Sequence, residues 1–296
     1  MILQFAGISR KTEFSPNHVV NDLLIINKTA DALKALGADV TMYDEGLITP
    51  ESVKEKLIFS MVQGPVGSKT LSKIEGRGAY IINSPRAVMN CYRINMVKLL
   101  PESGIPFPKS VIVSTDSDVN PKQAGLTTSK VWIKRGDVHA VHKEDVTLAN
   151  TDDEELTLLK EFHARDINEA ILQEHLDGDT VKFYAARETD LFYWYYLNGV
   201  YHTKFVEKRL RDLASASAEV LNLFVFGGDA IIGKDGSITI IDINDWPSFA
   251  PVRDQASQHI AQLIYRKAQE HVRNRNYDKK NTHHNGYPWA EIKGNF

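Results

Sequence analysis

Apolar and polar residues alternate along the first ninety positions in two different periods. Four short apolar runs predict strands at residues 2–8, 39–43, 57–62 and 79–82. Between the first two runs, apolar residues three and four positions apart predict a helix over residues 19–33, which Gly37 would end. A second helix is predicted near residues 68–74. This strand–helix order predicts a parallel sheet covered by helices, a Rossmann-like lobe.

Two further blocks of strands and helices follow. A helix over 90–100 and the prolines at 106 and 108 predict a linker into the second block. That block is predicted to contain strands at 110–114, 130–134 and 170–175 and a helix over 152–165. The third is predicted to contain strands at 181–186, 191–197 and 200–206, a helix over 209–222 and a hairpin over 226–244. A last amphipathic helix is predicted over 254–272.

These blocks predict an α/β (α+β) fold with three lobes. The predicted boundaries are 1–90 for the Rossmann-like substrate lobe, 91–177 for the central lobe and 178–272 for the third. Residues 273–296 have no clear period and are expected to form a loosely packed tail. No G-x-G-x-x-G follows the first strand, so dinucleotide binding is not expected there.

Composition excludes several classes of protein. The chain has 296 residues, with 35 Lys and Arg against 38 Asp and Glu, a net charge of −3. Such a balance is poorly suited to non-specific nucleic-acid binding. Its single cysteine excludes an internal disulfide or a multi-cysteine metal site. No apolar run approaches the ~18 residues of a membrane span. We therefore expect a cytoplasmic enzyme without nucleic-acid or membrane partners.

The hairpin predicts that two carboxylates meet. Asp235-Gly236 favours a two-residue type I′ turn, and counting outward from it pairs Asp229 with Asp242. Asn244 follows Asp242 on the same face because side chains alternate along a strand. Carboxylates about 4.5–5.5 Å apart repel each other, so a cation is expected between them. Three hard oxygen donors suit Mg²⁺ or Mn²⁺ held partly by substrate phosphates. Alternatively, the aspartates cap strand ends or pair with surface lysines.

Other charged residues have two interpretations. Lys204 and Arg209, around the start of a predicted helix, could stabilise an acyl-phosphate or a transferring phosphoryl group, or could form a solvated surface. His139 and His142 could act as acid, base or phosphate donor, or could be ordinary surface residues.

The hairpin resembles the closing motif of the ATP-grasp superfamily. Residues 242–247, Asp-Ile-Asn-Asp-Trp-Pro, match that family's D/E-x-N-x-x-P, and Asp229 matches the acidic residue on the preceding strand. The resemblance implies the ATP-grasp fold, with ATP and Mg²⁺ (or Mn²⁺) as cofactors. It also implies that Asp229, Asp242 and Asn244 ligate the metal.

The resemblance extends upstream. Arg93 lies on the helix that follows the first lobe, and Lys134 ends the strand whose lysine contacts ATP phosphates in the family. Residues 171–178 resemble the hinge strand, whose backbone would meet adenine, and a strand carrying Lys182 follows. The residues that the resemblance assigns to ATP are thus Arg93, Lys134, Gln173, Glu174, His175, Leu176 and Lys182.

The resemblance leaves the acceptor open. Most of the family are carboxylate–amine ligases that form an acyl-phosphate, and this is the leading hypothesis. The segment 135–143 has one glycine and two histidines in place of a glycine-rich loop. In this it resembles the inositol polyphosphate kinase branch, with His139 in that segment and Arg10 and Lys11 placed for substrate phosphates.

A kinase acting on a polyol phosphate is therefore the alternative, and an ATP-binding regulatory protein without turnover is a third. Asn17 would suit a carboxylate or amino-acid substrate. The acceptor is expected to be a small, anionic molecule, and the oligomeric state is left open. The residues expected to act in catalysis are Lys134, His139, Lys204 and Arg209.

Overall fold

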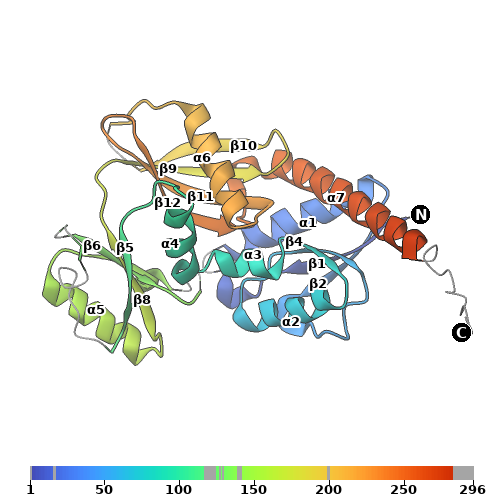
Figure 1. Cartoon of the computed structure of the whole chain (residues 1–296), viewed down its shortest axis with the longest axis horizontal. Helices are drawn as coiled ribbons and strands as arrows, with labels where there is room; N and C mark the ends of the chain where they lie inside the picture. Colours follow the sequence, from blue (N-terminus) through green and yellow to red (C-terminus); the bar gives the residue numbers. More distant parts are fainter. Residues whose placement is uncertain are drawn as a thin grey trace, which may run out of the picture.

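The computed structural model describes residues 2–15, 18–116, 125–126, 128, 130–138, 142–198 and 201–282. Within these ranges the strands form three four-stranded sheets, which Figure 1 shows as separate lobes. Short 3-10 helices η1 to η4 span Thr12–Phe14, Glu45–Leu47, Lys143–Asp145 and Ala250–Val252. No helix in the described ranges has both the length and the apolar character needed to cross a bilayer.

The first sheet is parallel, as the sequence predicts, with the order β2-β1-β3-β4. Its strands are β1 (Gln4–Ser9), β2 (Asp39–Asp44), β3 (Leu57–Ser60) and β4 (Tyr80–Ile82). Helix α1 (Val19–Ala35) packs on one face with α7 (Arg253–Thr282), and α2 (Pro65–Gly76) packs on the other. The buried residues of α1 recur three and four positions apart, and Gly37 follows the helix with a φ of +86°, which glycine adopts without strain.

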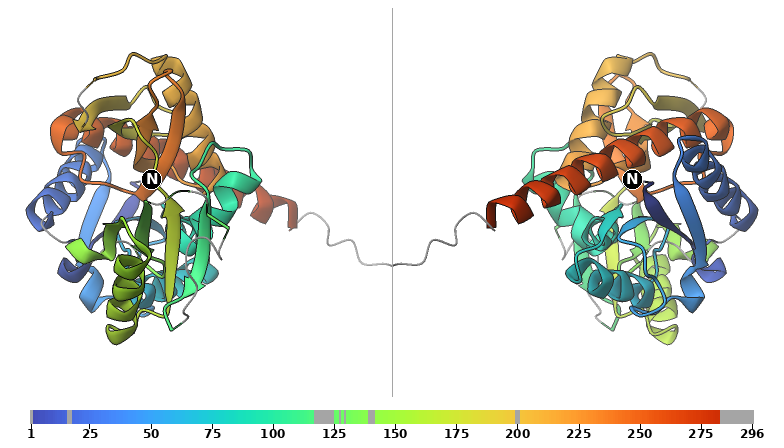
Figure 2. Two further views of the ribbon diagram at one scale, coloured as in Figure 1. Left: turned by 90° about the vertical axis from the view of Figure 1, so that its left-hand side faces the viewer. Right: turned by 90° about the vertical axis from the view of Figure 1, so that its right-hand side faces the viewer.

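Helix α7 ties the end of the described chain to its beginning. It runs beside α1, as Figure 2 shows, and its apolar residues join the core of the first sheet. The helix predicted to end near residue 272 continues to Thr282, so the predicted boundary at 272 lies inside α7. Polar residues dominate this last part, which explains why apolar periodicity does not reveal it.

The second sheet has the order β5-β8-β6-β7 and is antiparallel. Its strands are β5 (Ser110–Ser114), β6 (Val131–Arg135), β7 (Val146–Ala149) and β8 (Glu169–Glu174). Helix α5 (Asp152–Ala164) shares a core with it, and α3 (Pro85–Asn90) and α4 (Arg93–Glu102) lead into it. Strand β7 is not predicted from the sequence, because its four residues are too few to show a period.

The third sheet is antiparallel with the order β10-β9-β11-β12. Its strands are β9 (Asp179–Ala186), β10 (Phe192–Asn198), β11 (Val225–Ile232) and β12 (Ile238–Asp245), with α6 (Glu207–Val220) packed on it. The strand predicted over 200–206 is wrong, because 201–206 is irregular backbone. There the N–H groups of Tyr201 and Thr203 donate to the Asp179 carboxylate at 3.2 and 2.7 Å, in place of a neighbouring strand.

Candidate active site

Strands β11 and β12 place Asp229 directly opposite Asp242, which confirms the predicted pairing. The predicted turn is wrong by one residue. The N–H of Gly233 donates to the carbonyl of Ser237 at 2.9 Å, so the loop has three residues. Gly236 closes it with a φ of +78°, the left-handed conformation that a type I turn followed by a bulge requires.

A bulge on β12 restores the register. Ala230 pairs with Ile240, whereas Asp229 pairs with Asp242, so Ile241 is the extra residue. Regular alternation would turn Ile241 away from the face of Asp242. Because of the bulge, these two adjacent side chains line the same cavity.

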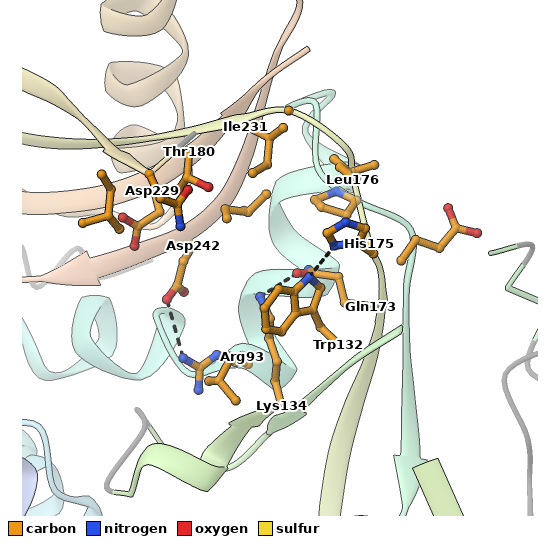
Figure 3. Close-up of a pocket in the computed structure, with 17 residues that line it drawn as sticks. Arg93, Trp132, Lys134, Gln173, His175, Leu176, Thr180, Asp229, Ile231 and Asp242 are labelled. Atoms are coloured by element: carbon orange, nitrogen blue, oxygen red, sulfur yellow. Dashed lines mark hydrogen bonds and ion pairs between the residues drawn. The ribbon is translucent and has the colours of Figure 1, made fainter. Parts of the chain in front are cut away.

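Two cations face the paired carboxylates, as the expected repulsion requires. Lys182 on β9 pairs with Asp229, and its Nζ lies 2.9 and 3.1 Å from the two carboxylate oxygens. Arg93, at the start of α4, places Nη2 3.5 Å from Oδ2 of Asp242 (Figure 3). Burial raises the pKa of the Asp229 carboxyl, and the charge of Lys182 opposes that rise.

A cavity of about 360 Å³ separates the second sheet from the hairpin. Figure 3 shows Asp229 and Asp242 beside each other, with Arg93 and Lys134 below them. Apolar side chains of Val146, Leu176 and Ile231 also line it. The predicted site residues that line this cavity are Arg93, Lys134, Gln173, Glu174, His175, Leu176, Asp229 and Asp242.

Lys134 is buried and held by one neutral partner. Its Nζ donates to Oε1 of Gln173 at 2.6 Å, and Nε2 of Gln173 donates to the Ser110 hydroxyl at 3.0 Å. Desolvation lowers the pKa of Lys134 to about 8. An ammonium group with so little solvation would be stabilised by phosphate oxygens beside it.

Trp132 and His175 also line this cavity. The indole N–H of Trp132 donates to Nδ1 of His175 at 3.2 Å, which leaves the imidazole proton on Nε2. The backbone N–H groups of Glu174 and His175 donate to the carbonyls of Lys109 and Lys130. A nucleotide base beside residues 171–178 would therefore have to contact other backbone groups of that segment.

A second cavity of about 270 Å³ adjoins the first and lies between the first sheet and the hairpin. Arg93 and Asp242 line both cavities. The predicted residues Arg10, Lys182 and Asn244 line the second. The two cavities thus meet at the paired carboxylates, beside a buried guanidinium.

Several predicted residues are placed elsewhere. Lys11 forms an exposed ion pair with Glu13 at 2.9 Å and lines neither cavity. Lys204 and Arg209 are exposed and line neither cavity. Both approach the hairpin turn, at Gly236 and Asp235 respectively. That turn lies beyond the end of β11 at Ile232, which is itself roughly 10 Å along the strand from Asp229, because each strand residue advances ~3.3 Å. Asn17 and His139 lie outside the described residues.

Ten residues that line the second cavity were not predicted from the sequence. They are Phe14, His18, Asp22, Gln63, Tyr184, Gly227, Gly228, Asp245, Pro247 and Ser248. Gln63 could have been found, because it follows β3 at the carboxyl edge of a parallel sheet, where ligands commonly bind. Trp132 could have been found as well, because it lies two positions before Lys134 on the same strand face.

The donor set suits a hard divalent cation. Within the described residues, no three His, Cys, Asp or Glu side chains cluster as metal ligands. Asp229 and Asp242 supply two facing carboxylates, and Asn244 adds an amide oxygen on the same strand as Asp242. Mg²⁺ is commonly held by one or two carboxylates together with substrate phosphates, so these residues fit that ion.

Models of protein families give no match to this chain, and neither does a search of curated protein sequences. Solved structures are similar. D-alanyl-alanine synthetase A from Vibrio cholerae has a TM-score of 0.70 and 11% identity over 90% of this chain and 98% of that one. D-alanine–D-alanine ligase from Bacillus anthracis complexed with ATP gives 0.68 and 13% over 93% and 99%.

A third similar structure is the RimK domain protein ATP-grasp from Sphaerobacter thermophilus. Its TM-score is 0.69 at 13% identity, over 88% of this chain and 99% of that one. Each of these three likenesses covers between 88% and 93% of this chain. The chain therefore has the ATP-grasp fold.

Proposed function

We propose that this chain is a Mg·ATP-dependent enzyme that ligates a carboxylate to an amine through an acyl-phosphate. The observation that carries the proposal is the pair of adjoining cavities that share Arg93 and Asp242. One is lined by the residues that suit a nucleotide, and the other reaches the edge of the first sheet. A phosphoryl group could pass between them at the paired carboxylates.

In this proposal ATP occupies the larger cavity, with its base between the apolar side chains and its phosphates toward Lys134. Asp229, Asp242 and Asn244 would hold Mg²⁺. Bound there, the ion would neutralise charge on the phosphates. Lys134 and Lys182 would contact phosphate oxygens, and Arg93 would stabilise charge on the group in transfer. Positioning and charge neutralisation supply most of the catalysis in such reactions.

The acceptor carboxylate would enter from the smaller cavity. Its oxygen forms a bond to the γ-phosphorus while the bond to the β-phosphate oxygen breaks, which releases ADP. The amine then attacks the acyl carbon, forms the C–N bond, loses a proton and expels phosphate. Exclusion of water between these two steps favours ligation, because water would otherwise hydrolyse the acyl-phosphate before the amine attacks.

Cations of the smaller cavity favour an acceptor with few negative charges. Arg10 is paired with Asp22, Lys182 with Asp229, and Arg93 with Asp242. Lys11 is paired at the surface, away from this cavity. A polyol polyphosphate would need several further cations, whereas the Lys and Arg side chains in the described lining of this cavity are Arg10, which Asp22 holds, and Lys182 and Arg93, which the proposal assigns to ATP. The paired cations, together with the fold likeness to D-alanine–D-alanine ligase, support the ligase over the kinase.

The proposal is tested by measuring ADP release with carboxylate and amine substrates supplied singly and in pairs. A ligase is expected to need both and to give a condensed product by mass spectrometry. A product heavier by one phosphate, with no amine incorporated, would establish the kinase, which the Asp-Ile-Asn motif favours as the second candidate. Tight nucleotide binding without turnover on any pair would indicate a regulatory protein. Asp242→Asn serves as the inactive control.

A further inference from the structure

Arg10 joins the first sheet to the end of strand β12. It follows β1, and its side chain is 8% exposed. Its Nε donates to the carbonyl of Met61, the residue after β3, at 3.1 Å. Its Nη2 donates to the carbonyls of Asp245 at 3.4 Å and Trp246 at 3.0 Å. One guanidinium therefore holds two central strands against the backbone that directly follows Asn244.

The charge of Arg10 is neutralised inside the protein. Its Nη1 lies 2.8 Å from Oδ2 of Asp22, and the same oxygen accepts a hydrogen bond from the Ser15 hydroxyl at 2.6 Å. Asp22 and Ser15 are both buried. Arg10 lines the smaller cavity, yet most of its donors are committed to protein acceptors. This arrangement suits a structural link better than recognition of an anionic acceptor.

The backbone after Asn244 is held in an unusual conformation. Trp246 has a φ of +34°, which lies in the left-handed region that non-glycine residues seldom adopt. Its indole ring is fully buried and stacks on Phe59 of β3, with ring centroids 6.2 Å apart. Gln63 adds a second link from the first lobe, because its Nε2 donates to Oδ1 of Asp245 at 2.9 Å. The first lobe thus determines where β12 ends.

We propose that Arg10 is a positioning residue for the metal site. It places Asn244 by holding the carbonyls of the next two residues. The inference rests on the proposed function, since it takes Asn244 as a metal ligand. Consecutive Cα atoms are ~3.8 Å apart, so a shift at Asp245 is transmitted to Asn244. Metal ligands displaced by a fraction of an ångström coordinate poorly, and the carbonyl contacts prevent such a shift.

Arg10→Lys tests the inference with Mn²⁺ and ADP, which require no acceptor. Lysine keeps a positive charge for Asp22, but a single ammonium cannot reproduce the guanidinium fork. Calorimetry is expected to show at least a tenfold loss of the Mn²⁺-dependent affinity for ADP. Hydrogen exchange of the amides in residues 243–249 is expected to accelerate. In turnover, kcat is expected to fall while the acceptor KM stays within twofold.

Two further variants make the result specific. Arg253→Lys is the matched control, because Arg253 links α7 to Asn21 of α1 at 2.6 Å and, among the described residues, makes no hydrogen bond or ion pair to β12. It is expected to leave Mn²⁺·ADP binding and exchange at 243–249 unchanged. Gln63→Met removes the second link while keeping Arg10, and it is expected to shift both readouts in the same direction as Arg10→Lys. It also provides the test if Arg10→Lys does not fold.

Contrary results are distinguishable. A large rise in acceptor KM with unchanged Mn²⁺·ADP binding would make Arg10 a substrate contact and overturn the inference. Unchanged binding and exchange in both Arg10→Lys and Gln63→Met would also overturn it. If the wild-type protein itself binds no Mn²⁺·ADP, the proposed function fails, and the inference fails with it.

Discussion

Lys182 bridges both carboxylate oxygens of Asp229, with Nζ at 2.9 and 3.1 Å, from the strand directly beside β11. The side chains are 26% and 16% exposed, so water screens this ion pair only partly. The repulsion between Asp229 and Asp242 is therefore balanced by protein groups as well as by any metal bound there.

Lys182→Met is expected to destabilise the protein by about 1–3 kcal/mol at pH 7, because Asp229 keeps a partly buried charge without its partner. Thermal denaturation measures the loss. Added Mg²⁺ is expected to raise the melting temperature of the variant more than that of the wild type. Lys208→Met is the control, since its ion pair with Asp212 is exposed and should contribute little. Equal melting temperatures for the Lys182 variant and the wild type would contradict the expected role.

Asp242→Asn is expected to lower turnover by about 10²–10³-fold or more while the fold is retained. The substitution removes one of two facing carboxylates, so relief of repulsion offsets loss of the contact with Arg93. Turnover and melting temperature are measured together. Asp235→Asn, in the turn of the same hairpin, is the control and should keep full activity. Full activity of the Asp242→Asn variant would exclude Asp242 as a metal ligand.

The sequence predicted the paired carboxylates because a strand has a strict period of two and Asp-Gly marks a turn. The pairing of Asp229 with Asp242 was correct although the turn was misjudged, since the bulge at Ile241 cancels the error of one residue. A bulge leaves no mark in the apolar pattern here, because Ile240, Ile241 and Ile243 are all isoleucine. The prediction was therefore correct for a partly wrong reason.

Residues that meet only through packing of lobes were harder to predict. Lys204 and Arg209 were chosen for charge and nearness in sequence, and the irregular segment 201–206 brings them to the hairpin turn, away from both cavities. Gln63 and Asp245 belong to different lobes and are 182 positions apart in the sequence, so no local pattern could predict their contact. Family resemblance supplied Arg93 and Lys134, and both side chains line the larger cavity.

Glu155 predicts a pH-dependent stability away from the active site. Its carboxylate oxygens are buried in α5 without a hydrogen-bond partner among the described residues. Burial raises its pKa to about 7, and Asp152 adds to the rise. The native carboxyl keeps its proton to a higher pH than the unfolded one, whose pKa is about 4.3. The free energy of unfolding should therefore fall as pH rises from about 4.3 through 7, and stay low above.

Glu155→Gln is expected to remove this dependence. Relative to the wild type, the variant should gain about 1–3 kcal/mol in unfolding free energy between pH 5 and pH 8. Denaturant titrations at several pH values measure the difference. Glu161→Gln, at an exposed position of the same helix, is the control and should follow the wild type. Parallel pH profiles for Glu155→Gln and the wild type would show that Glu155 is ionised in the native protein.

Lys134 predicts how nucleotide binding depends on pH. Burial lowers its pKa to about 8, so the ammonium is about half protonated at pH 8. Phosphates beside it favour the charged form, and binding of Mg·ATP is therefore expected to take up about half a proton at that pH. Affinity should be constant below about pH 7 and should fall above pH 8, because the neutral amine no longer attracts phosphate.

Calorimetry in buffers of different ionisation enthalpy measures the proton uptake directly. Lys134→Arg is the control, since a guanidinium stays charged over this range and should take up no proton. Equal uptake by the arginine variant would assign the proton to another group.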